Sequence, residues 1–305
     1  MNGILIVDKP EGITSHDVVA RLRRILKTKK IGHTGTLDPF ATGVLVMLVG
    51  KATRLARFFD KDAKGYDALV NFGYETDTGD RTGERIAHPD GYVLPPITPE
   101  DLFKAISGFM GEIAQTPPMY SAKKIDGKKL YELAREGKEV ERKPVNVTIY
   151  KLQISQENLP EIPDADTWNL RFLVQCSAGT YIRTLAEDIG RELGHFAHLR
   201  ELRRTSAGRF DISSAKTLDE VDEAENKAAL LISMNDAMHH LPQLNLDDER
   251  SAATVNGLST RARLDGMPDG GAIRMLDQNG ELIAIGIYDA KEEIVQPKVV
   301  LGYDD

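Results

Sequence analysis

The sequence predicts an α+β fold with a mixed, largely antiparallel sheet, followed by a smaller β-rich unit. Helical and strand patterns share the first 240 residues without strict strand–helix alternation, which disfavours a doubly wound parallel sheet. From about residue 245 the chain changes to short apolar runs broken by glycine. A length of 305 residues suffices for about two domains. We therefore expect one domain over residues 1–240 and a second over residues 245–305.

The first elements follow from local patterns. Residues 3–7 form a short apolar run typical of a strand. Thr14 and Asp17 have the spacing of a capping box, and apolar residues then recur with helical spacing as far as Leu26, which leaves the basic side chains on the opposite face. Other strands are expected at residues 44–49, 66–72, 145–155 and 168–176, and other helices at 51–59, 98–110, 127–136 and 180–193.

The connecting segments also carry signals. Residues 77–96 are polar and rich in turn residues, and residues 216–240 predict a helical, acidic connection. In the last part of the chain, Asn279-Gly280 separates two β-prone runs, at residues 273–276 and 282–287. An Asn-Gly pair in this position is a strong hairpin signal.

Charge is unevenly distributed. The net charge is −8, which by itself argues against a nucleic-acid partner. However, residues 21–30 carry six basic side chains and no acid, residues 200–209 are also basic, and acidic residues gather in 211–250. Such segregation can give one face a positive potential that binds phosphates. For either basic run alone, a solvated surface is the simpler explanation.

Composition excludes several classes of protein. The single cysteine, Cys176, excludes an internal disulfide and a cysteine-rich zinc site, and we expect it to pack within a strand. The first residues lack a basic lead followed by a long apolar core, and no window approaches 18 uncharged apolar residues. A soluble cytoplasmic protein with no membrane partner is therefore expected.

The segment most suited to chemistry spans residues 32–43. It holds one carboxylate, Asp38, directly before Pro39 and among three glycines that allow close backbone approach to a ligand. This arrangement presents an acid at a loop tip, as a nucleophile or a base would be presented. On spacing alone, the simpler interpretation is a turn in which Asp38 caps its own backbone.

Longer motifs favour the chemical interpretation. Residues 32–43, GHTGTLDPFATG, resemble the Gly-His-Thr-Gly-x-Leu-Asp-Pro-x-Ala-Thr-Gly signature of the pseudouridine synthases that act on the T-loop of tRNA. Four further blocks resemble that family in the expected order, namely DKPEGITS at 8–15, KGYDA at 64–68, PPMYSAKK at 117–124 and CSAGTYIRTLAEDIG at 176–190. The resemblance spans nearly all of residues 2–215.

The resemblance implies a catalytic set of three residues. Asp38 falls on the family's catalytic aspartate and is expected to be the nucleophile. Arg183 is expected beside it, because a guanidinium fixes both the charge and the direction of a carboxylate. The expected helix over 180–193 places residues 180 and 183 one turn apart. Tyr66 is expected to pack against the flipped base and to move the proton of C5.

The resemblance also implies substrate-binding residues. His33, expected in the same loop as Asp38, would contact or replace extruded bases, where the residues alone indicate only a turn histidine. Tyr181 and Gly35 are expected to line the pocket, although a core tyrosine explains Tyr181 equally simply. Lys9 and Lys123 complete the set, the latter in a basic insertion over about residues 119–143. In bacterial members this insertion closes over the RNA, although a solvated helix would have a similar composition.

The tail resembles the small β-barrel PUA module that often follows such synthases, against the alternative of a β-extension of the first domain. We expect no cofactor, because isomerising a uridine needs no electron carrier. We also expect no metal, because His195 and His198 lack further ligands nearby. The expected partner is tRNA, bound through its T-arm and T-loop. We expect no DNA partner, and we expect the protein to be a monomer.

Three other functions stay open at this point. A guide-RNA-dependent synthase would use the same catalytic core, although the insertion at 119–143 favours a stand-alone enzyme. An RNA-binding or tRNA-folding protein with incidental catalysis would retain the same surface. A metal-assisted nuclease built on Asp38 is disfavoured, because no further carboxylates lie near it in the sequence.

Overall fold

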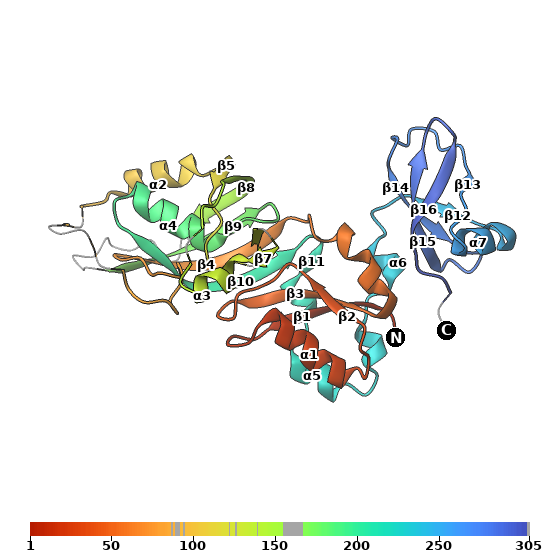
Figure 1. Ribbon diagram of the computed structural model, residues 1–305, viewed down its shortest axis with the longest axis horizontal. Coiled ribbons are helices and arrows are strands. Elements are labelled where there is room, and N and C mark those ends of the chain that lie inside the picture. The colour runs from red at the N-terminus through yellow and green to blue at the C-terminus, as the bar shows by residue number, and fades with distance from the viewer. Residues whose placement is uncertain are drawn as a thin grey trace.

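The computed structural model describes residues 1–86, 88, 92–93, 95–121, 123–125, 127–138, 140–154 and 167–303. Figure 1 shows an elongated molecule in which a large sheet with its helices is followed by a smaller β-rich unit at the C-terminal end. The predicted α+β class with a mixed sheet is confirmed. None of the helices in these ranges combines the length and the apolar character that crossing a membrane requires.

The large sheet has nine strands in the order β1-β3-β10-β4-β9-β8-β5, with β2 on β3 and β11 on β10. All of its pairs are antiparallel except that of β10 with β3, where Arg203 lies opposite Thr42. The strands are β1 Gly3–Lys9, β2 Ile31–Thr34, β3 Thr42–Val49, β4 Lys64–Phe72, β5 Gly111–Gln115, β8 Val145–Ile154, β9 Trp168–Cys176, β10 Ala197–Ala207 and β11 Phe210–Asp211. Cys176 is buried in β9, as expected.

Helices pack against this sheet, and at the β1–β3 end they cover both of its faces. The first, α1, spans Ser15–Ile25, and the predicted capping box of Thr14 and Asp17 is present. Apolar side chains of α4, Ile182–Glu192, pack against β4 and β10 in one core cluster. Tyr181 is the N-cap of α4. The prediction of a helix from residue 180 is therefore wrong by two residues, because Thr180 is held in the preceding turn by a bond from its Oγ1 to the carbonyl of Ser177.

Several short elements depart from the predictions. The expected helix over 51–59 is the 3₁₀ helix η1, Gly50–Phe58, and the helix α2 covers Pro99–Gly108. After η3 Ile212–Ser214, the predicted helical connection over 216–240 consists of three short helices, namely α5 Leu218–Glu223, η4 Lys227–Leu230 and α6 Met234–Ala237. In the insertion, strands β6 Lys124–Ile125 and β7 Lys128–Lys129 pair as a hairpin, which delays the helix α3 to Leu130–Arg135.

The C-terminal unit is a five-stranded sheet in the order β12-β14-β15-β16-β13. The predicted Asn-Gly hairpin is confirmed, because β14 and β15 pair antiparallel across it. Leu276, Ile285 and Val299 of this unit share an apolar cluster with Ile4 and Leu55 of the first domain. The elements are β12 Gln243–Asn245, α7 Asp248–Val255, β13 Thr260–Arg261, β14 Ala272–Leu276, β15 Leu282–Asp289 and β16 Ile294–Val300.

Gly43 tests the packing at the start of β3. Its φ is +100°, and an added Cβ would lie 2.2 Å from the carbonyl oxygen of Arg204 on β10. We expect Gly43→Ala to lower the free energy of unfolding by about 3 kcal/mol, from backbone strain and overpacking together. The control is Gly280→Ala, where φ is +80° and nothing lies within 4 Å of the added Cβ. We expect Gly280→Ala to lower the free energy of unfolding by only about 1 kcal/mol. Urea unfolding followed by circular dichroism measures both variants. Equal losses of stability in the two variants would contradict the steric argument.

Candidate active site

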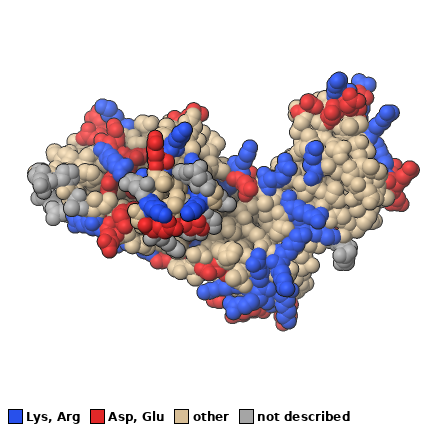
Figure 2. All heavy atoms as spheres, in the orientation of Figure 1, with Lys and Arg blue, Asp and Glu red and all other residues tan. Residues whose placement is uncertain are grey.

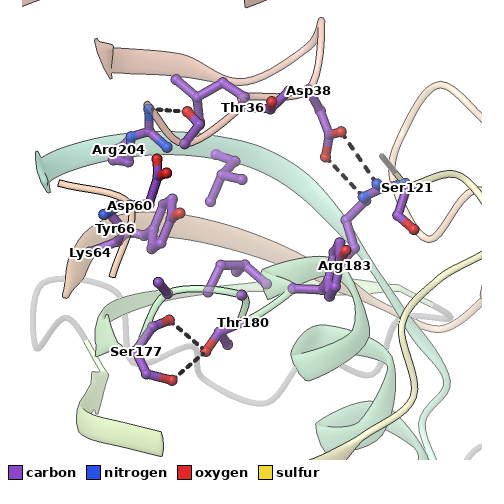
Figure 3. Close-up of a pocket in the computed structure, with 17 residues that line it drawn as sticks. Thr36, Asp38, Asp60, Lys64, Tyr66, Ser121, Ser177, Thr180, Arg183 and Arg204 are labelled. Atoms are coloured by element: carbon purple, nitrogen blue, oxygen red, sulfur yellow. Dashed lines mark hydrogen bonds and ion pairs between the residues drawn. The ribbon is translucent and has the colours of Figure 1, made fainter. Parts of the chain in front are cut away.

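A cavity of about 240 Å³ opens beside the Asp38 loop (Figure 3). Its walls come from the loop after β2, from β4 and β10, and from the turn that leads into α4. Five of the eight residues predicted from the sequence line it, namely Gly35, Asp38, Tyr66, Tyr181 and Arg183. The other lining residues are Thr36, Leu37, Asp60, Lys64, Ser121, Ser177, Ala178, Gly179, Thr180, Ile182, Leu202 and Arg204.

Asp38 and Arg183 form a two-point ion pair at one end of this cavity. Arg183 Nε lies 3.0 Å from Asp38 Oδ2, and Nη2 donates to Oδ1 at 3.3 Å. The arginine side chain is only 5 % exposed, whereas the carboxylate, at 36 %, is open to the cavity. Burial raises the pKa of Asp38, the nearby Arg183 opposes that rise, and Asp80 adds to it. The pair thus holds a carboxylate in one direction with a free edge.

Other segments hold Arg183 from behind. Its Nη1 donates to the carbonyl of Thr78 at 2.8 Å, and its Nη2 donates to that of Tyr120 at 2.7 Å. Asp80 Oδ2 lies 3.6 Å from Nη1. Asp80 itself is buried and accepts a bond from the backbone of Thr82 at 2.9 Å. Sequence analysis missed Asp80, because the turn-rich segment that holds it gives no sign of its contact with α4.

The first turn of α4 is fixed by Gln115, which is fully buried at the end of β5. Its Oε1 accepts from the backbone N–H of Tyr181 at 2.7 Å, and its Nε2 donates to the carbonyl of Tyr181 at 3.0 Å. The Gln115 amide therefore satisfies both backbone groups of Tyr181, as a neighbouring strand would. These two bonds fix the start of α4 and so the position of Arg183. Sequence analysis also missed Gln115, since an isolated glutamine carries no pattern.

Tyr66 lies toward the other end of the cavity, with Arg204 beside it (Figure 3). Burial raises the pKa of Tyr66, and the Arg204 guanidinium opposes the rise. Arg204 is 1 % exposed, and it donates from Nε to the carbonyl of Val44 at 2.6 Å and from Nη2 to that of Gly35 at 2.9 Å. The interpretation of residues 200–209 as a basic surface is therefore wrong for Arg204, because alternation along β10 turns it inward.

Three predicted binding residues do not line the cavity. His33 lies in β2 opposite Met47 rather than in the loop of Asp38, so the prediction of a shared loop is wrong. Lys9 is fully buried and donates to the carbonyls of Pro10 and Pro39, at 2.8 and 3.1 Å, so it supports the Asp38 loop from within. Burial lowers its pKa to about 8. Lys123 is half-buried beside the insertion hairpin.

The surface basic residues gather around α1. All six basic side chains of residues 21–30 are exposed, as the helical pattern predicts. Figure 2 shows Lys and Arg concentrated over this part of the molecule and continuing toward the C-terminal unit. A local positive surface therefore coexists with the net charge of −8.

The histidines expected to pack do so within the described ranges. His195 accepts at Nδ1 from the indole of Trp168 at 3.0 Å, and His198 bonds the carbonyl of Tyr74 through Nδ1 at 3.1 Å. Across the described part of the chain, no group of three or more His, Cys, Asp or Glu side chains is arranged to hold a metal ion.

Comparison with known proteins identifies the family of the chain. A family model described as "TruB family pseudouridylate synthase (N terminal domain)" matches residues 23–182, and one described as "tRNA pseudouridylate synthase B C-terminal domain" matches residues 183–238. The chain belongs to the TruB family of pseudouridylate synthases. The first of these matches contains the Asp38 loop, Tyr66 and Tyr181, and the second begins at Arg183, so the boundary between them falls within α4.

Individual relatives of the TruB family match almost end to end. A protein of Geobacillus kaustophilus named tRNA pseudouridine synthase B is 46 % identical over 86 % of this chain and 91 % of its own length. The protein of that name from Bacillus subtilis is 39 % identical over 99 % and 98 %. Among solved structures, a Cbf5-Nop10-Gar1 complex contains a chain that is 28 % identical with a TM-score of 0.70, over 98 % of this chain and 84 % of that one.

Glu187, on α4, lies under the loop that holds Arg183. A Cβ added to Gly79 would lie 2.5 Å from its Oε1, so the carboxyl packs directly against that loop. Burial, opposed by Arg191 and aided by Glu75 and Asp188, raises the pKa of Glu187 to about 7. The group is thus expected to change charge near neutral pH.

We expect Glu187→Gln to stabilise the protein relative to wild type as pH rises. Because the folded pKa lies above the ordinary 4.5, the stability that the protonated carboxyl contributes at acid pH is lost as pH rises through about 7. The difference in free energy of unfolding should grow by about 2–3 kcal/mol between pH 5 and pH 8, at about 1.4 kcal/mol per pKa unit. Urea unfolding at both pH values measures it, with exposed Glu192→Gln as the control, and a pH-independent difference would refute the assignment.

Proposed function

We propose that this protein converts the T-loop uridine at position 55 of tRNA to pseudouridine, without a guide RNA. The observation that carries the proposal is the two-point pair of Asp38 and Arg183 at the mouth of a cavity that also holds Tyr66. Relatives named tRNA pseudouridine synthase B extend over nearly the whole chain, which supports the tRNA substrate.

The chemistry needs a nucleophile, a pocket and a proton acceptor. Asp38 supplies the nucleophile, with one carboxylate edge fixed by Arg183 and the rest open to the cavity. The C1′–N1 bond breaks, the base turns within the cavity, and C1′ joins C5. Tyr66, packed against the base, takes part in moving the proton that C5 loses. Pseudouridine is an isomer of uridine: C5 loses a proton and N1 gains one, so no oxidant, reductant or water is consumed.

The burial of Tyr66 and Arg183 in the cavity supports extrusion of the nucleotide from the RNA. A cavity of about 240 Å³ admits a single flipped nucleotide rather than a stacked loop. His33 lies on the neighbouring strand β2, where it would meet the bases that remain. The insertion at about 119–143 would close over the RNA through Lys123 and its other basic residues. It is linked to the site by the bond from Arg183 to the carbonyl of Tyr120.

The exposed lysines and arginines of α1 and the C-terminal unit would bind the T-arm. We infer that residues 245–305 form a PUA-like RNA-binding domain, and the apolar cluster that this unit shares with the first domain supports a fixed position on the catalytic domain. We propose that the protein acts as a monomer in the cytoplasm, without DNA or membrane partners.

A guide-dependent synthase is the second candidate, because two solved neighbours come from a Cbf5-Nop10-Gar1 complex and an H/ACA RNP bound to a substrate RNA. These neighbours are 25–28 % identical, whereas the proteins named tRNA pseudouridine synthase B are 37–46 % identical. Stand-alone action is therefore the better-supported proposal.

Release of tritium from C5-labelled uridine in an unmodified tRNA transcript tests the function directly. With EDTA present and no guide RNA, wild type should release the label, because the proposed reaction uses neither. Asp38→Asn should lower the rate on the order of 10⁴- to 10⁶-fold, since it removes the nucleophile, while tRNA binding persists. Wild type that is folded but inactive on bare transcript would overturn the proposal. A variant that restores full tRNA function in cells without product would favour the tRNA-folding role.

Tyr66→Phe tests the proton step, because it keeps the ring that packs on the base and removes only the hydroxyl. We expect the tritium-release rate to fall about 10²- to 10⁴-fold, the range for loss of a general acid–base group, with tRNA affinity unchanged in filter binding. Exposed Tyr150→Phe, on the surface of β8, is the matched control. An unaltered rate in Tyr66→Phe would remove the hydroxyl from the mechanism.

A further inference from the structure

The end of the cavity away from Arg183 holds two buried cations. Arg204 is 1 % exposed and Lys64 is 5 % exposed, and both line the cavity beside Tyr66 (Figure 3). Lys64 comes from β4 and Arg204 from β10, and these two strands are hydrogen-bonded neighbours. Their positive charges are therefore held close together on the surface that a bound base would meet.

Neither cation has a carboxylate partner within 4 Å among the described residues. Arg204 donates to the neutral carbonyls of Val44 and Gly35, and Lys64 donates to the carbonyls of Asp62, at 2.7 Å, and Phe59, at 3.5 Å. The carboxylates of Asp62 and Asp60 attract Lys64 without forming an ion pair with it. Burying an ion without a counter-ion is costly. Such a charge is useful where a negative charge forms only during the reaction, because nothing then neutralises it beforehand.

The neighbouring residue shows the contrast. Arg203 points to the opposite face of β10, where its Nη2 and Nη1 bind the two carboxylate oxygens of Asp8 at 2.6 and 3.1 Å. That arginine is an ordinary paired one and is absent from the catalytic cavity. The unpaired state of Arg204 is thus a property of its position in the cavity and not of this stretch of the strand.

One nitrogen of Arg204 faces the cavity. Nε and Nη2 are used by backbone carbonyls, whereas Nη1 lies where a side chain at position 35 would be, 3.3 Å from an ideal Cβ on Gly35. The same Cβ would lie 3.4 Å from Lys64 Cε. Gly35 has φ +67°, so both the backbone and the space favour glycine there. The missing side chain leaves the two cations open to a ligand.

We propose that Arg204, assisted by Lys64, is a catalytic cation that stabilises negative charge on the uracil ring. This inference rests on the proposed function. When the C1′–N1 bond breaks, its electron pair stays on N1 and spreads to the ring oxygens, while Asp38 bonds the carbon that becomes electron-poor. If Asp38 instead adds to C6, the displaced pair again moves onto the ring. In both routes the base becomes an anion, and joining C5 to C1′ returns the electron pair to the new bond.

The test compares uridine with a target whose base is a better leaving group. Fluorine at C5 withdraws electrons, so a 5-fluorouracil anion needs less help from a cation. Two transcripts carry either uridine or 5-fluorouridine at the target position. The measurement is the single-turnover rate at which the N-glycoside becomes a C-glycoside, at saturating enzyme, with chromatography of the digested RNA. The proteins are wild type, Arg204→Met, Arg204→Lys and Arg203→Met as the paired-arginine control.

For uridine, Arg204→Met should lose about 10²- to 10³-fold in rate, as expected for one stabilising donor. With 5-fluorouridine the loss should be about tenfold smaller, because the 5-fluorouracil anion is less basic and needs less stabilisation as it departs. Like Arg204→Met, Arg204→Lys lacks the guanidinium that bonds Val44 and Gly35, but it keeps a positive charge. Its rate on uridine should therefore be about tenfold higher than that of Arg204→Met. Arg203→Met should match wild type on both transcripts.

Two results would overturn the inference. Equal losses on both transcripts would mean that Arg204 acts only by holding the loop of Gly35 in place, and an Arg204→Met enzyme with the wild-type rate would exclude any role. If thermal melting shows Arg204→Met to be unfolded, Arg204→Lys carries the same comparison of transcripts with the same two outcomes. Wild type that fails to convert the uridine transcript would instead overturn the proposed function.

Discussion

The burial of Arg183 is the constraint on which the catalytic domain depends. A guanidinium at 5 % exposure must have its donors satisfied, because an unpaired buried charge costs several kcal/mol. Its partners come from separate parts of the chain: Asp38 after β2, Thr78 and Asp80 after β4, and Tyr120 at the start of the insertion. Satisfying one side chain therefore draws three distant loops onto the first turn of α4. The same bonds that stabilise the fold also fix the direction of the carboxylate.

The two ends of the cavity have opposite electrostatic character. At one end the charge of Arg183 is matched by Asp38 and Asp80, so a nucleophile is held ready without a strong net field. At the other, Arg204 and Lys64 donate to backbone carbonyls and form no ion pair with a described carboxylate within 4 Å, although Asp60 and Asp62 lie close enough to attract Lys64. In the proposed mechanism, a neutral uridine binds between these two ends, and electrons move from the Asp38 end toward the Arg204 end. Buried cations without an ion-pair partner at the Arg204 end would stabilise the negative charge that forms there during the reaction.

Local patterns predicted most elements of the fold. The capping box of α1, the alternation of β4 and the Asn-Gly hairpin each depend on residues near in sequence, and each is present. The family motifs likewise predicted that Arg183 lies beside Asp38. What sequence could not show were contacts decided by tertiary placement. Arg203 and Arg204 look equivalent in a basic run, yet period-two alternation on β10, a strand between β3 and β4, makes one a surface ion pair and the other a cavity cation.

The net charge misleads for the same reason. The net charge of −8 sums over the whole surface, whereas a ligand contacts only one face of the protein. The helical period of α1 buries Val18, Val19 and Leu22 against β1 and β3 and so forces its arginines outward. The C-terminal unit is then fixed beside this surface by its share of the first domain's apolar cluster. Because apolar packing sets where the positive face lies, substitutions in that core would displace the positive surface relative to Asp38 without removing a charge.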